Sequence, residues 1–212
     1  MKTKRILTCA VVLLAALSTQ AGLFGFHNIT TNTPYGDALE SQLRMDASDT
    51  GSNVIFTNNA DGMPATVKTI YFGTDLQDLG LSIDYMTGSE GVSFEILEVD
   101  GPGNIAPPGW EEFEFWWSFT VAAAAALPSP AENGIDPGEY LAMELSYDNS
   151  ASFSTLVDDG LVHVALHVIS IDGDGSETFR NDDDVIPEPA SLVLIGSAGI
   201  IIAFARRRVV FG

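Results

Sequence analysis

The sequence is short of cysteine, of basic residues and of helical hydrophobic periodicity. Its one cysteine, Cys9, lies in an apolar stretch near the N-terminus, so the rest of the chain forms no disulfide and offers no thiolate for catalysis or metal binding. Nine residues are Lys or Arg against 29 Asp or Glu, which gives a formal net charge of −20. Such a chain repels nucleic acid and anionic membranes, and cations or neutral glycans are the compatible partners.

The sequence also lacks the motifs of common enzymes. It has no G-x-S-x-G turn for a nucleophilic serine, no glycine-rich phosphate loop and no Walker lysine. Carboxylates are so numerous that some pair suited to glycoside hydrolysis is inevitable and carries no information. We therefore expect a protein that is not an enzyme and that uses no cofactor.

The first 21 residues have the pattern of a secretory signal peptide. Lys2, Lys4 and Arg5 precede an apolar or small stretch over 6–17, and small residues over 18–21 supply a cleavage site after Ala21. This segment is predicted to be a signal helix that is removed during export.

A second hydrophobic segment lies near the C-terminus. It follows a proline-flanked glutamate and precedes a basic cluster: Pro187, Glu188 and Pro189, then Leu192–Ala205, then Arg206, Arg207 and Arg208. As a helix the apolar run rises about 21 Å, short of the roughly 30 Å hydrocarbon core. The arginines compensate for this short length, because their side-chain stems reach the headgroup layer. Clustered basic residues also stay on the cytoplasmic side of the membrane. The tail therefore predicts a transmembrane helix with a basic stop, and an ordinary anchor or a buried core helix are the alternatives.

This tripartite tail resembles the PEP-CTERM sorting signal of exported bacterial proteins, which in that family is recognised and processed by an exosortase, a membrane-embedded transpeptidase. Blocks of the body are similar, in the same order, to a group of small PEP-CTERM proteins: Val54–Asn59, Ile70–Phe72, Gly91–Phe94, Asn133–Glu139, His167–Val168 and Gly175–Phe179. The resemblance implies signal peptidase and exosortase as partners and a transient inner-membrane intermediate. It further implies delivery to the cell surface or a biofilm matrix, with exopolysaccharide as a further partner, and it assigns no catalytic residue.

The body between the two signals has the pattern of an all-β domain. Apolar and polar residues alternate along short segments that Gly, Asn and Asp separate, as in half-buried strands. The alternating sets are Phe113, Phe115, Trp117, Phe119 and Val121; Leu79, Leu81, Ile83 and Tyr85; and Val92, Phe94 and Ile96. Further expected strands are 42–47, 53–58, 66–72, 140–147 and 161–171, whereas the alanine run 122–126 fits one helical turn or a strand end.

These patterns favour an antiparallel β-sandwich of the jelly-roll kind. We assign residues 1–21 to the signal peptide, 22–180 to the β domain, 181–186 to a solvated acidic linker and 187–212 to the sorting signal.

Three sets of residues are candidates for binding. His163 and His167 are four apart, but on a strand such residues stand about 13 Å from each other, too far to share one zinc. Asp172, Asp174 and Glu177 offer oxygen ligands on a glycine-rich loop and form a weak calcium candidate that departs from the EF-hand pattern. Trp110 and Trp116, beside Glu112 and Glu114, are the candidates for stacking on a sugar ring.

The sequence thus predicts an exported, non-enzymatic surface or matrix protein. The alternative is a carbohydrate-binding module that contacts glycan through Trp110 and Trp116.

Overall fold

The computed structural model describes residues 22–74, 76, 79–97, 107–108 and 118–185. Ten strands and three short helices are present in them. The strands are β1 (Gly22–Asn28), β2 (Leu43–Ala47), β3 (Asn53–Asn58), β4 (Thr66–Thr74), β5 (Ser82–Gly88), β6 (Phe94–Leu97), β7 (Ser118–Ala125), β8 (Tyr140–Ser146), β9 (Val162–Ile171) and β10 (Gly175–Val185). The helices are α2 (Gly36–Leu39), α3 (Pro130–Asn133) and α4 (Phe153–Asp158).

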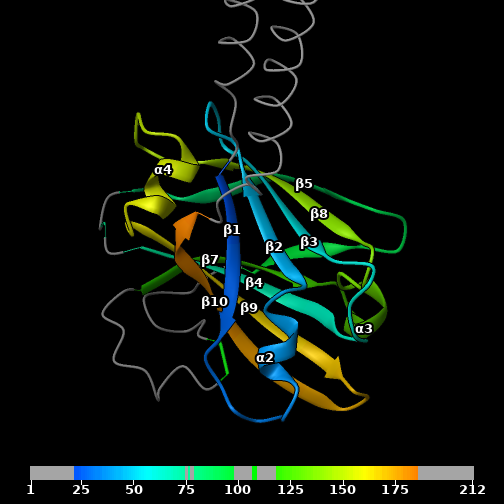
Figure 1. Ribbon diagram of the computed structural model, residues 1–212. Coiled ribbons are helices and arrows are strands. Elements are labelled where there is room, and N and C mark those ends of the chain that lie inside the picture. Colours follow the sequence, from blue (N-terminus) through cyan, green and yellow to red (C-terminus); the bar gives the residue numbers. More distant parts are fainter. Residues whose placement is uncertain (1–21, 75, 77–78, 98–106, 109–117, 186–212) are drawn as a thin grey trace, which may run out of the picture.

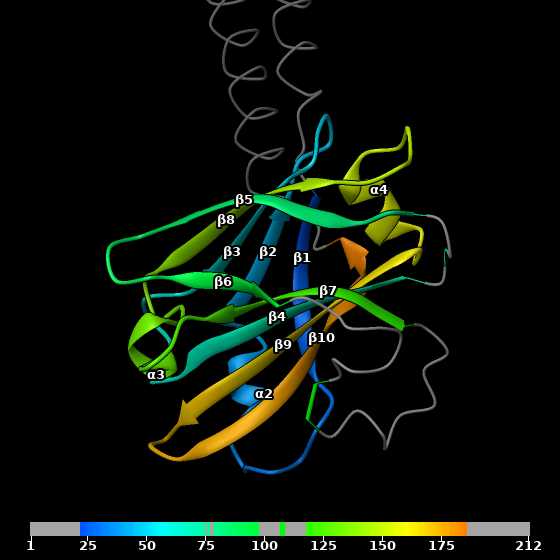
Figure 2. The same ribbon diagram turned by 180° about the vertical axis from the view of Figure 1, so that it is seen from behind.

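All strands belong to one antiparallel sheet in the order β5-β8-β3-β2-β1-β10-β9-β4-β7-β6. The sheet folds over on itself and is nearly closed into a barrel, with its two end strands, β5 and β6, facing each other across the open side (Figures 1 and 2). The predicted all-β antiparallel fold is confirmed. The finer expectation, two separate jelly-roll sheets, is not confirmed, because β1 and β10 join both halves through continuous pairing.

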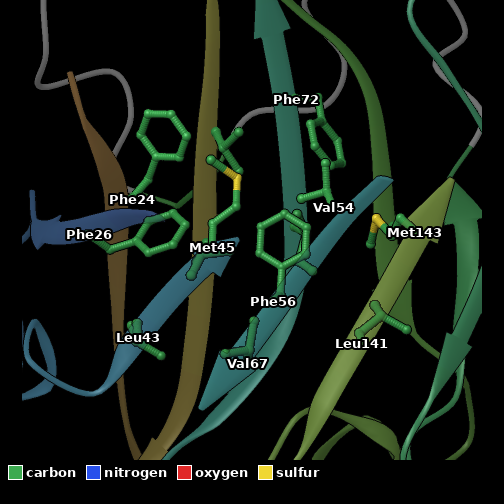
Figure 3. Close-up of a cluster of buried hydrophobic side chains, with 14 of the residues drawn as sticks. Phe24, Phe26, Leu43, Met45, Val54, Phe56, Val67, Phe72, Leu141 and Met143 are labelled. Atoms are coloured by element: carbon green, nitrogen blue, oxygen red, sulfur yellow. The ribbon is translucent and has the colours of Figure 1, made fainter. Parts of the chain in front are cut away.

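The alternating apolar residues fill the interior of this sheet. Figure 3 shows side chains from β1, β2, β3, β4 and β8 pointing toward one another. Phe72 makes edge-to-face contacts with Phe56 and Phe153, at ring-centroid distances of 6.0 and 6.1 Å. Each fully buried side chain of this kind contributes about 1.5–3 kcal/mol, so this core is the main source of stability.

The alanine run forms part of strand β7 rather than a helical turn. Ala123 lies opposite Ile70 of β4 and Ile96 of β6, and Ala122 lies opposite Tyr71 and Leu97. Both alanines are fully buried, Ala123 in the main core and Ala122 in a smaller cluster with Tyr71 and Phe119.

Strand β10 continues further than the sequence indicates. It runs to Val185, which lies opposite Phe24 of β1, so residues 181–185 belong to the sheet and not to a solvated linker. The cause is visible at Asn181, which is completely buried and whose side-chain oxygen accepts a hydrogen bond from the Val164 amide at 2.7 Å. The acidic residues after Asn181 make this segment resemble a linker in the sequence, although Asn181 itself is bonded into the sheet.

The predicted signal helix and the predicted transmembrane helix lie outside the described residues. Among the residues that are described, no helix has the length and apolar character needed to cross a membrane.

Candidate functional site

Both ends of the domain lie at one pole of the barrel. Strand β1 begins at Gly22, strand β10 ends at Val185, and the two strands are antiparallel neighbours with Phe24 opposite Val185. The β2–β3 turn and α4 lie at the same end (Figure 1). Gly22 is packed so tightly that a β-carbon there would stand 2.8 Å from the Phe24 ring and 2.9 Å from the Ser154 β-carbon. Residue 22 must therefore be small if the start of β1 is to dock.

Several predicted site residues fall outside the described part of the chain. These are the sorting motif Pro187, Glu188 and Pro189, the basic stop Arg206, Arg207 and Arg208, and the two tryptophans Trp110 and Trp116. Their roles remain predictions.

The three calcium candidates are not brought together. Asp172 and Asp174 lie exposed in the β9–β10 turn, where Gly173 has a φ of 111° and Asp172 has a φ of 50°. Glu177, in contrast, is 1% exposed. Across the described residues, no group of three or more His, Cys, Asp or Glu side chains is placed to hold a metal ion.

The Glu177 carboxylate binds the segment that follows β1. It accepts hydrogen bonds from the Thr30 hydroxyl and from the backbone amides of Asn32 and Thr33, the Asn32 bond being 3.2 Å long. The Thr30 hydroxyl in turn accepts from the Thr178 amide at 2.8 Å. Glu177 is thus a structural anchor between β10 and the β1–α2 connection. The sequence shows only its spacing to Asp172 and Asp174, which made it a weak calcium candidate.

The two histidines lie on strand β9, as predicted, and at separate positions along it. His163 lies opposite Gly73, and His167 lies between Thr69 of β4 and Thr178 of β10. Burial, together with the nearby Lys68 charge, lowers the pKa of His167 from 6.5 to about 4. His167 is therefore neutral at physiological pH and acts as a packed side chain of the sheet.

A surface that the sequence did not indicate lies on the outer face of β5, β8 and β3. We call it the tyrosine face, and define it by Tyr85, Thr87, Tyr140, Ala142, Glu144, Asn53 and Ile55. Tyr85 lies opposite Glu144, which lies opposite Asn53; Thr87 lies opposite Ala142, which lies opposite Ile55. Three large side chains stand out from this face: Tyr85 is 61% exposed, Tyr140 44% and Ile55 39%.

An open hollow of about 540 Å³ borders the tyrosine face. Asp84, Glu144 and Ser146 line it on the sheet side, and the β2–β3 turn and the β8–α4 connection line it on the other. Asp84 accepts a hydrogen bond from the Ser146 hydroxyl at 2.9 Å, and the Ser82 and Ser146 hydroxyls are 2.7 Å apart. Burial raises the pKa of the Tyr147 hydroxyl, which donates to the Ala151 carbonyl at 3.2 Å.

Sequence periodicity placed Tyr85 on the same face as Leu79, Leu81 and Ile83, which are buried. A bulge between Ile83 and Tyr85 places Tyr85 on the outer face instead. Ile83 lies opposite Leu145, whereas Tyr85, two residues later, lies opposite Glu144, which is directly adjacent to Leu145 in β8. Asp84 is the extra residue. The only sequence signal was a polar residue between two large apolar ones, which also fits an ordinary strand.

Comparison of the chain with protein-family models, with curated proteins and with solved structures finds no match.

Proposed function

We propose that the chain is an exported, non-enzymatic protein that an exosortase sorts through its C-terminal signal to the cell surface or an extracellular matrix. Its signal peptide is removed after Ala21, and its tail is held in the inner membrane by residues 192–205 until processing. In this proposal the two halves of the sheet act as the layers of a sandwich that stands outside the membrane.

The observation that best supports the proposal is the pairing of Phe24 with Val185. The first described strand begins at Gly22, directly after the predicted cleavage site, and the last described strand ends at Val185, two residues before Pro187. The two proposed processing sites are therefore adjacent in sequence to strand ends that pair at one pole, where a protein tethered by its tail would face the membrane. The excess of acidic residues suits an extracellular domain that remains soluble.

The test is the intact mass of the protein recovered from its native host. The expected species lacks residues 1–21 and has also lost its C-terminal segment within or after the Pro187–Pro189 motif. A Glu188→Ala variant should keep the tail and accumulate in the membrane fraction, whereas the matched Glu132→Ala change, on the exposed surface of α3, should be processed normally. Recovery of wild-type protein with its final residues intact would reduce the tail to a simple anchor.

A further inference from the structure

The tyrosine face combines exposed rings with a small residue between them. Ala142 lies at its centre, between Thr87 on β5 and Ile55 on β3. Along β8, Tyr140 lies four residues from Glu144, the partner of Tyr85, which corresponds to about 13 Å along the strand. The two exposed rings therefore stand on the same face of the sheet with the small side chain of Ala142 between them, at a separation comparable to two or three sugar rings of an extended chain.

The hollow that Asp84 and Glu144 line supplies hydrogen-bonding groups at the Tyr85 end of the tyrosine face. Asp84 and Glu144 are acceptors, and Ser82 and Ser146 carry hydroxyls. The Asp84–Ser146 bond fixes the carboxylate in position before any ligand arrives. Apolar rings with a few oriented polar groups are what recognition of a polyhydroxyl compound requires.

We infer that the tyrosine face and the adjoining hollow form a binding site for an uncharged glycan, with Tyr85 and Tyr140 stacking on sugar rings and Asp84 and Glu144 accepting from sugar hydroxyls. This proposal uses residues other than Trp110 and Trp116, and it does not depend on how the chain is sorted.

Charge argues against an anionic occupant and against a second copy of the chain. Asp46, Asp84 and Glu144 lie on or beside the face, and Arg44, the one basic residue of the neighbouring strand β2, donates to the Glu40 and Leu43 carbonyls at 2.8 and 2.6 Å. An acidic polysaccharide meets repulsion here. A second copy of the chain, packed face to face, would bring these same carboxylates together, which opposes self-association.

The test uses the full chain in a zwitterionic detergent, because sugar-headed detergents would compete for the site. Native gel electrophoresis is run through gels that contain hydroxyethyl cellulose, dextran, galactomannan or, as the charged comparison, alginate. We expect at least one of the three neutral polysaccharides to retard the protein and alginate to leave it unaffected. Tyr85→Ala and Tyr140→Ala should each weaken the retardation about tenfold, as expected for the loss of one stacking ring.

Matched variants separate binding from folding. Tyr35→Ala removes a tyrosine that is 41% exposed beside α2, away from the tyrosine face, and should bind as the wild type does. Tyr85→Phe keeps the ring and should retain most of the retardation. The inference is overturned if none of the three neutral polysaccharides retards the protein, if Tyr85→Ala and Tyr140→Ala bind like Tyr35→Ala, or if the retardation tracks a dimer in sedimentation that Tyr85→Ala abolishes.

Discussion

A Glu177→Gln substitution should destabilise the protein by about 2–3 kcal/mol, because hydrogen bonds that a buried carboxylate accepts from hydroxyl and backbone N–H donors are stronger than bonds between neutral groups. The amide would turn its nitrogen toward either the Thr30 hydroxyl and the Asn32 amide or the Thr33 amide, where a donor faces a donor. Urea denaturation measures the loss. Glu90→Gln, in the exposed turn after β5, is the matched control and should change stability little.

His167 makes a second prediction at the residue scale. Its pKa in the folded chain is about 4, below its ordinary value of 6.5, so the unfolded chain takes up the proton first as pH falls. The contribution of neutral His167 to the free energy of unfolding is complete above pH 6.5 and is lost as pH falls from 6.5 toward about 4. We expect the difference in melting temperature between wild type and His167→Gln to shrink across that window. Parallel curves for the two proteins would show that His167 does not titrate in this way.

At the scale of elements, strand β7 gives a direct test of the alanine run. Ala123→Leu adds three carbons at a fully buried position of the core between β4 and β6, so overpacking should cost about 1–3 kcal/mol. Ala131→Leu, in the exposed helix α3, is the control and should be close to neutral. Chemical denaturation measures the free energy of unfolding of both variants. If Ala123→Leu were as stable as Ala131→Leu, residue 123 would not be enclosed between two strands.

Elements also show how far sequence reasoning reached. The sequence located β3, β4, β8 and β9 nearly to the residue. Strands β3 and β8 bury one face, so their residues alternate, whereas β4 and most of β9 are buried on both faces and appear as nearly continuous apolar runs. The sequence pattern failed at Tyr85, where a bulge changes which face a residue occupies without changing composition. It failed again at β10, where a strand carries acidic residues that resemble a linker and is held by the buried Asn181.

The candidate site was less predictable than the fold for a related reason. Strand β8 is contiguous in sequence, but its partners β5 and β3 come from segments about 60 and 90 residues earlier, so no local pattern reports that Tyr85 and Ile55 flank Ala142. Conversely, the spacing of Asp172, Asp174 and Glu177 is local, and it indicated a cluster, whereas Asp172 and Asp174 lie exposed in the turn and Glu177 is buried in β10. The sequence pattern therefore grouped residues that are close along the chain and missed residues that only the fold brings together.

At the scale of the whole molecule, the net charge of −20 makes stability depend on ionic strength. Raising NaCl from about 10 mM to about 150 mM shortens the screening length from about 30 to about 8 Å and weakens repulsion among the carboxylates. We expect the melting temperature of the full chain in zwitterionic detergent to rise by about 2–4 °C, as for about 1 kcal/mol of relief.

The same experiment tests the separated carboxylates Asp172 and Asp174 against a calcium site. If the acidic surface responds only to screening, CaCl₂ and MgCl₂ at equal ionic strength should raise the melting temperature by equal amounts. The two salts should also have equal effects on the Asp174→Asn variant. Specific binding would appear as an extra, saturable rise with Ca²⁺, because a ligand that binds only the folded state stabilises it in proportion to the logarithm of its concentration. Such a rise, lost in Asp174→Asn, would show that the β9–β10 turn rearranges to bring Asp172 and Asp174 around the ion.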